Sequence, residues 1–159
     1  KSRTSSTHSN PRILLGIGNT EKGDDGVGPY VASLLENSTW YTVDAGVAPE
    51  NFTGVVRRHR PGLVVMVDAA DMGLPPGAIR RLPVESLKQA GLDTHTLPLS
   101  LLAHYLEQFC PRVVIIGIQP EHVFPGRGLS PRIKKAAQEL AALLASGRLE
   151  EIPVIEKNP

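Results

Sequence analysis

The chain has 159 residues and a mass of 17.1 kDa, which fits one compact domain. Apolar residues make up 41% and charged residues 21%, which excludes a disordered chain of low hydrophobicity. The net charge of +1 provides no general attraction for nucleic acid or for an anionic membrane. Cys110 is the only cysteine, and apolar runs such as Leu63–Val67 are far shorter than the roughly 20 residues of a membrane span. We therefore expect a cytoplasmic protein without membrane insertion.

Three regions are expected along the chain. Residues 1–11 are polar and lack an initiating Met, so we interpret them as a disordered leader or a remnant of cloning. Residues 12–147 are expected to form the α/β domain, and residues 148–159 a C-terminal tail.

The secondary structure alternates between strands and helices, which is typical of βα units in a parallel sheet. The predicted strands are Ile13–Ile17, Trp40–Val43, Leu63–Val67, Ala78–Leu82 and Arg112–Ile118. The predicted helices are Val27–Asn37, Pro49–His59, Val84–Ala90, Pro98–Phe109 and Pro131–Ser146. Because Ala78–Leu82 alternates apolar residues with arginines, it fits an edge strand. The pattern predicts a three-layer αβα domain with a mostly parallel sheet of about five strands.

Polar residues follow several predicted strands. Asp25 lies in the loop after the first strand, Asp44 ends the second, and Asp68 ends the third. Gln119 follows the last strand, and His95 lies in a loop before a helix. A single Asp at a strand end is usually a turn or cap residue. Three acids at the carboxyl ends of parallel strands, where ligands bind in such sheets, indicate a functional site.

Two chemistries fit this set of side chains. Two carboxylates and an imidazole suit a borderline divalent ion such as zinc, nickel or manganese, and they leave coordination positions open for a substrate. Closely placed carboxylates can instead share a proton and activate water, as in aspartic proteases. The residues alone do not separate these two uses.

A nucleotide site is disfavoured in the first loop, although Gly16 and Gly18 follow a strand there. A dinucleotide fingerprint needs Gly at the position of Glu21, and Asp24 and Asp25 would repel a pyrophosphate. At the start of a helix, acids also have a plainer explanation, because they complement the helix dipole.

Five motifs in one order resemble those of the hydrogenase maturation endopeptidases, which process the large subunit of nickel–iron hydrogenases. They are Gly16–Asn19 with Gly23–Gly28, Asp44–Asn51, Val67–Gly73, Thr94-His95 with Pro98-Leu99, and Gly117–Glu121. The resemblance runs from about Ile13 to Leu144 and is greatest to the branch that serves hydrogenase 3-type enzymes.

The resemblance implies an endopeptidase that removes a C-terminal extension from the large-subunit precursor after nickel insertion. Carried over by motif, Asp25, Asp68 and His95 would contact nickel, which the precursor carries as a recognition signal. Asp44 and Gln119 would orient neighbouring groups or contact substrate. Either a metal-bound hydroxide or a carboxylate, Asp25 or Asp68, could activate the water. No nucleotide cofactor is implied.

Two alternatives remain beside this resemblance. A peptidyl-tRNA hydrolase-like protein also opens with a Gly-x-Gly-Asn loop, but it would need a basic face for RNA. A nickel-dependent chaperone would bind the precursor without cutting it.

Surface docking is a further expectation. The basic runs Arg57–Arg60 and Arg132–Lys135 are usually solvated surface, and docking to an acidic precursor surface is the alternative. Met72, Leu74 and Phe124 are candidates for an apolar docking patch near the site.

Overall fold

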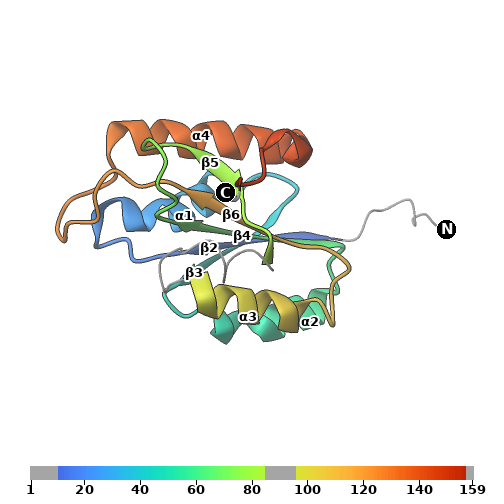
Figure 1. The fold of residues 1–159 in the computed structure, drawn as a ribbon. Helices are drawn as coiled ribbons and strands as arrows, with labels where there is room; N and C mark the ends of the chain where they lie inside the picture. Colours follow the sequence, from blue (N-terminus) through green and yellow to red (C-terminus); the bar gives the residue numbers. More distant parts are fainter. Residues whose placement is uncertain (1–10, 85–95, 157–159) are drawn as a thin grey trace.

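A five-stranded sheet lies between two layers of helices in the computed structural model, which describes residues 11–84 and 96–156 (Figure 1). The strands are β2 (Arg12–Ile17), β3 (Tyr41–Gly46), β4 (Leu63–Ala69), β5 (Ile79–Arg81) and β6 (Val113–Ile118). Their order in the sheet is β3-β2-β4-β6-β5, and β5 alone pairs antiparallel, with β6, at one edge. The predicted α/β class, the mostly parallel sheet and the edge position of β5 are confirmed.

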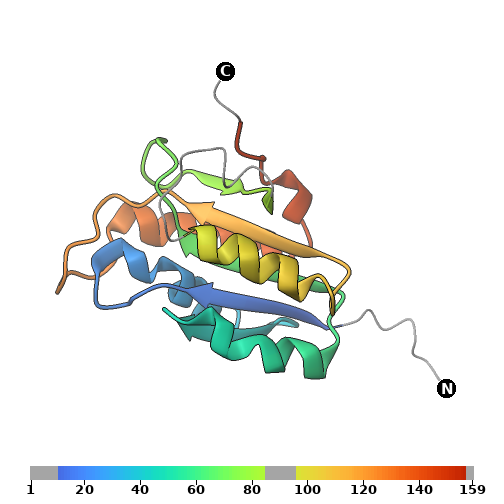
Figure 2. The same ribbon diagram turned by 60° about the horizontal axis from the view of Figure 1, so that its bottom comes forward.

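Helices cover both faces of the sheet. Helices α1 (Val27–Leu34) and α4 (Pro131–Ala145) lie on one face, and α2 (Thr53–His59) and α3 (Thr96–Leu106) lie on the other (Figures 1 and 2). The 3₁₀ helices are η1 (Gly23–Gly26), η2 (Pro49–Phe52) and η4 (Leu149–Glu151). None of the helices in the described residues is both long and apolar enough to cross a membrane.

The central strands are buried on both faces, because successive side chains of a strand point to opposite sides. On β2, Leu14 packs into the core under α1 and α4, whereas Ile13 and Leu15 pack into the core under α2 and α3. Trp40, just before β3, anchors α4, because its indole N–H donates a hydrogen bond of 3.0 Å to the Leu144 carbonyl.

Several predicted boundaries differ from the structure. Asp68 lies within β4, which continues to Ala69 instead of ending at Val67. Asp44 does not end its strand, because β3 continues to Gly46. The pairing with β2 ends at Gly46, whose φ of 56° forms a turn there. Helix α3 begins at Thr96, two residues before the predicted start at Pro98. The predicted helix Val84–Ala90, apart from Val84, and residues 1–10 of the predicted leader lie outside the described residues.

The segment that follows Gly147 packs against the domain. Leu149 and Ile152 are buried in the same core as α1 and α4. The backbone of Arg81 in β5 donates to the Pro153 carbonyl at 2.8 Å and accepts from the Ile155 amide at 3.0 Å. This segment, which the sequence suggests as a tail, therefore covers the edge of the sheet at β5.

Candidate functional site

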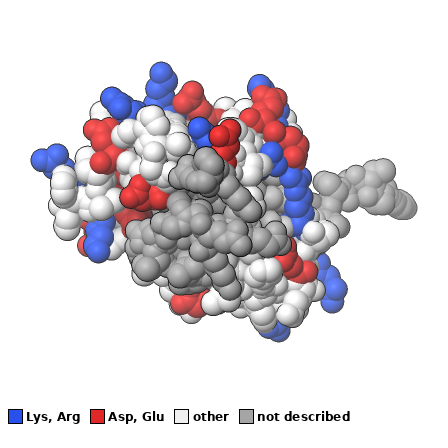
Figure 3. Space-filling view, viewed as in Figure 1, with Lys and Arg blue, Asp and Glu red and all other residues white. Residues whose placement is uncertain are grey.

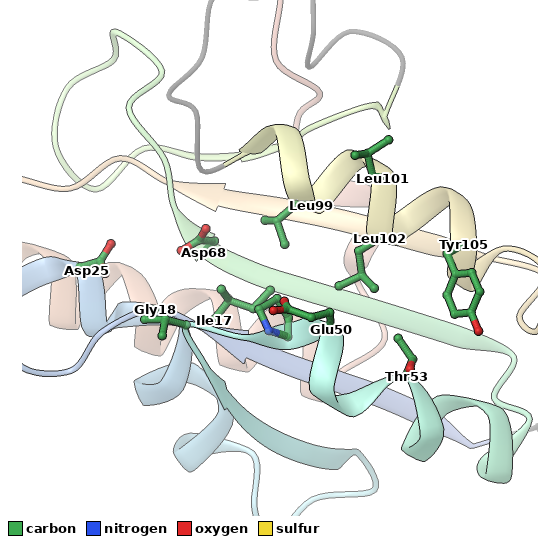
Figure 4. Close-up of a pocket in the computed structure, with 12 residues that line it drawn as sticks. Ile17, Gly18, Asp25, Glu50, Thr53, Asp68, Leu99, Leu101, Leu102 and Tyr105 are labelled. Carbon is green, nitrogen blue, oxygen red and sulfur yellow. The ribbon is translucent and has the colours of Figure 1, made fainter.

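A pocket of about 650 Å³ opens where β2 and β4 end. Asp25 and Asp68 lie at one end of this pocket, and Tyr105 of α3 lies at the other (Figure 4). Asp25 is half-buried, whereas Asp68 is buried with 5% of its surface exposed. Two carboxylates that are 43 positions apart in the sequence are thus brought to one cavity, at the edge of the sheet that the sequence analysis predicted.

The position of Asp25 depends on the loop between β2 and η1. The Asn19 amide donates a hydrogen bond of 2.8 Å to Oδ2 of Asp25. Gly18 has a φ of 141°, and a Cβ on it would lie only 1.9 Å from the carbonyl oxygen of Asp25. Glycine is therefore required where the backbone of residue 18 passes that of Asp25. This close approach lets the loop hold the Asp25 carboxylate at the pocket.

The neighbouring Asp24 has a different role. Its side chain is fully buried, and its carboxylate accepts hydrogen bonds from the backbone amides of Glu121, His122 and Ser130 at 2.6–3.0 Å and from the Ser130 hydroxyl at 2.7 Å. Burial acts to raise the pKa of Asp24, but these hydrogen bonds outweigh it and hold the pKa below its ordinary value of 3.8. Asp24 therefore ties η1 to the loop between β6 and α4.

Sequence analysis placed Asp25 in the predicted site, but it gave Asp24 only the helix-dipole explanation and did not identify its role in folding. No local pattern does so, because the groups that bind Asp24 lie about 100 residues away in the chain. The structure assigns Asp24 to folding and Asp25 to the pocket.

Gln119 lies in a second pocket of about 520 Å³ that shares Asp25 and Val47 with the first. Its side-chain oxygen accepts hydrogen bonds from the backbone amides of Met72, at 2.6 Å, and Leu74, at 3.3 Å. Gln119 therefore holds the loop after β4 and contributes to the cavity beside Asp25.

Asp44 lies outside the pocket that contains Asp25 and Asp68. Its side chain is exposed, accepts a hydrogen bond of 3.1 Å from the Gly46 amide, and borders a separate depression beside Tyr30 and Leu129. The structure therefore does not bring Asp44 together with the two pocket carboxylates.

The third predicted metal-contacting residue, His95, lies outside the described residues. Within residues 11–84 and 96–156, no three His, Cys, Asp or Glu side chains are grouped so that they could hold a metal ion. Asp25 and Asp68 are thus the two members of the predicted set that can be located.

The exposed apolar side chains beside the pocket differ from those expected. Val47 and Leu101 line it and are 71% and 64% exposed, and Tyr105 is 38% exposed. Of the residues proposed as a patch, Phe124 is exposed, whereas Met72 packs against the core under α2 and α3. The i, i+4 spacing of Leu101 and Tyr105 was the available signal, since it puts both on one face of α3.

Charge is mixed over the surface. Basic and acidic side chains are interspersed on the visible part of the face in Figure 3, in keeping with the net charge of +1. Among the described residues visible on this face, there is no continuous basic surface of the kind that RNA binding requires.

Comparisons with known proteins agree with this arrangement. The family model of the hydrogenase maturation protease HycI matches residues 30–146. The hydrogenase 3 maturation protease of Escherichia coli strain K12 is 39% identical over 115 residues, which cover 70% of this chain and 74% of the relative.

Solved structures share the fold. The endopeptidase HycI from Escherichia coli superposes with a TM-score of 0.81 at 31% identity, covering 94% of this chain and 99% of that one. The nickel–iron hydrogenase maturation protease HycI from Thermococcus kodakarensis KOD1 superposes with a TM-score of 0.79 at 32% identity, covering 90% of this chain and 95% of that one. These matches favour the resemblance over the peptidyl-tRNA hydrolase alternative. The chain belongs to the hydrogenase maturation protease family and is an endopeptidase of that family.

Proposed function

We propose that this protein removes the C-terminal extension of a nickel–iron hydrogenase large-subunit precursor, and that it recognises the precursor by its inserted nickel. The observation that carries the proposal is the meeting of Asp25 and Asp68 in one pocket, in a chain of this family. Carboxylates suit a divalent ion that has open coordination positions, and nickel bound to the precursor is such an ion.

Asp25, Asp68 and His95 are the proposed contacts to nickel. Asp68 is buried, so its carboxylate is shielded from bulk water and interacts strongly with a cation. Asp25 is half-buried and is fixed at one oxygen by the Asn19 amide. We assign the general base to Asp25, because solvent reaches it more readily and its other oxygen can accept the proton of the attacking water.

The reaction balances as an ordinary peptide hydrolysis. Asp25 takes a proton from water as the water oxygen adds to the scissile carbonyl carbon, and Asp25 then gives that proton to the leaving amine as the C–N bond breaks. The expected products are the mature large subunit and one intact C-terminal peptide. The cytoplasmic location stays a prediction.

The test compares wild type with Asp25→Asn and with Glu139→Gln, which neutralises an exposed acid on α4, on the other face of the sheet. Purified precursor, with and without nickel, is incubated with each protein, and the peptide released is measured by mass spectrometry. We expect nickel-dependent release by wild type and by Glu139→Gln, and a rate at least about 100-fold lower for Asp25→Asn.

Normal processing by a folded Asp25→Asn variant would refute the role of Asp25. Release of the same peptide without nickel would refute recognition through the metal. If wild type binds the nickel-loaded precursor tightly but leaves it intact, the non-cleaving chaperone is the correct reading.

A further inference from the structure

The pocket that contains Asp25 and Asp68 continues along the sheet between α2 and α3. These helices lie side by side on one face (Figures 1 and 2), and Figure 4 shows Thr53 of α2 opposite Tyr105 of α3 at the far end of the pocket. Directly beyond them lies another pocket of about 450 Å³, and its lining residues are Gly54, Arg57, Arg58, Arg60, Gln108 and Phe109.

The two pockets are neighbours, although no residue lines both. Thr53 lines the first pocket and Arg57 the second, and because they are four residues apart on α2 they lie on a single face. Tyr105 lines the first pocket and Phe109, which follows the end of α3 at Leu106, lines the second; their rings are in edge contact with centroids 5.2 Å apart. We call the two pockets together, from Asp68 to Arg57, the α2–α3 groove.

The groove is acidic at one end and basic at the other. Asp25, Asp68 and Glu50 line the first pocket, whereas three arginines line the second. Among the residues that the structure describes, no acidic side chain forms an ion pair with Arg57, Arg58 or Arg60. The arginines complement the dipole at the end of α2, but that interaction leaves their hydrogen-bond donors available to an anion.

The middle of the groove is apolar. Leu99 and Leu102 of α3 point into it, and Tyr105 adds a ring that is 38% exposed (Figure 4). Further along, the Arg57 guanidinium lies over the Phe109 ring, 5.5 Å from its centroid, which positions the positive charge at the groove wall.

The length of the groove sets the spacing that it can recognise. Strand β4 runs beneath it from Leu63, three residues after Arg60, to Asp68. At about 3.3 Å per residue those five steps span about 17 Å, and an extended peptide covers the same length with about five residues.

We propose that the α2–α3 groove binds the C-terminal extension of the precursor as an extended chain. Apolar side chains of the extension lie along Leu102 and Tyr105, and acidic side chains about five residues from the scissile bond meet Arg57 and Arg58. The extension is the fitting occupant because a groove between two helices admits a single chain, whereas the nickel-bearing body is a folded domain. This inference rests on the proposed function.

The test replaces both arginines in Arg57→Gln/Arg58→Gln, and its matched control is Lys134→Gln/Lys135→Gln, which removes two exposed positive charges from α4 on the opposite face. Arg60 is left unchanged, because its φ of 43° makes any substitution a change of backbone strain as well. Cleavage of the nickel-loaded precursor is measured as KM and kcat at low and at high salt. A fluorescent peptide copied from the extension reports binding by anisotropy.

We expect the arginine variant to raise KM and the peptide Kd roughly five- to tenfold at low salt with kcat unchanged, and the lysine control to stay within twofold of wild type. At high salt the KM and the peptide Kd of wild type should approach those of the arginine variant, because salt screens exposed charges.

Wild-type KM and peptide affinity in a folded arginine variant would overturn the proposal, as would an equal effect in the lysine control. Failure of wild type to cleave any precursor would instead overturn the proposed function, because the peptide-binding arm does not depend on cleavage.

Discussion

Two adjacent acids, Asp24 and Asp25, lie in different environments. Asp24 is completely buried and accepts hydrogen bonds from three backbone amides and one hydroxyl, whereas Asp25 is half-buried at the pocket. Ionised carboxylates accept such hydrogen bonds strongly, so Asp24 stabilises the fold in its charged form. The same residue type therefore serves two purposes at successive positions, and burial decides which.

This assignment predicts the effect of Asp24→Asn on stability. At pH 7 the variant should lose about 2–4 kcal/mol of unfolding free energy, because an amide nitrogen would face the donors that the carboxylate accepts. The pKa of Asp24 is lowered in the fold, so its stabilisation is fully present above pH 3.8, the ordinary value, and is lost as the pH falls through the lower folded pKa.

Urea unfolding followed by circular dichroism at pH 7 and at pH 3 measures this difference. The difference in unfolding free energy between wild type and Asp24→Asn should be smaller at pH 3 than at pH 7. An equal difference at both pH values would show that the charge of Asp24 does not contribute to stability.

Helix α1 lies in backbone contact with the sheet at its first turn. A Cβ on Gly28 would lie 2.3 Å from the Ile17 carbonyl oxygen and 2.4 Å from that of Val67. Because α1 directly follows η1, which carries Asp25, this contact also fixes the position of Asp25 relative to the sheet. Packing of α1 thus positions the neighbouring element that carries Asp25.

Gly28→Ala should therefore destabilise the protein by about 1–3 kcal/mol and reduce cleavage, since α1 must move away from β2 and β4. The direction of this stability change is informative, because a Gly→Ala substitution within a helix ordinarily stabilises a protein by up to about 1 kcal/mol. Gly54→Ala in α2 is the matched control, because the contact there is only the mobile end of Arg58, at 3.2 Å. Thermal unfolding compares the two, and equal shifts for both variants would contradict the close-contact argument.

At the scale of the whole molecule, the chain after Gly147 closes one edge of the sheet. Leu149 and Ile152 are buried, and Glu150 pairs with both Arg81 and Arg112. These ion pairs are exposed and contribute little, so the apolar burial is the main stabilising contribution of this segment.

Truncation after Gly147 should lower the unfolding free energy by about 3–6 kcal/mol, from the burial of two large apolar side chains. Chemical denaturation of the truncated and full chains measures the loss. A truncated protein of unchanged stability would support the domain boundary at residue 147 that the sequence analysis predicts.

Much of this architecture follows from local patterns in the sequence. The β-branched runs and the helical periodicity between them predicted the alternation of elements, because burial on two faces leaves a continuous apolar run. The arginines of β5 indicated an edge strand, and the acids after β2 and β4 indicated the edge of the sheet that holds the site. These features depend on residues near one another in the chain, so the sequence alone determined them.

Other features were decided only by tertiary structure. The buried role of Asp24, the position of Asp44 away from the pocket and the packing of Leu149 and Ile152 depend on contacts with distant parts of the chain. The α2–α3 groove likewise forms only when two helices that are separated in the chain by strands β4 and β5 lie side by side on one face. Local patterns specify which elements form, but the three-dimensional packing of those elements decides which side chains meet.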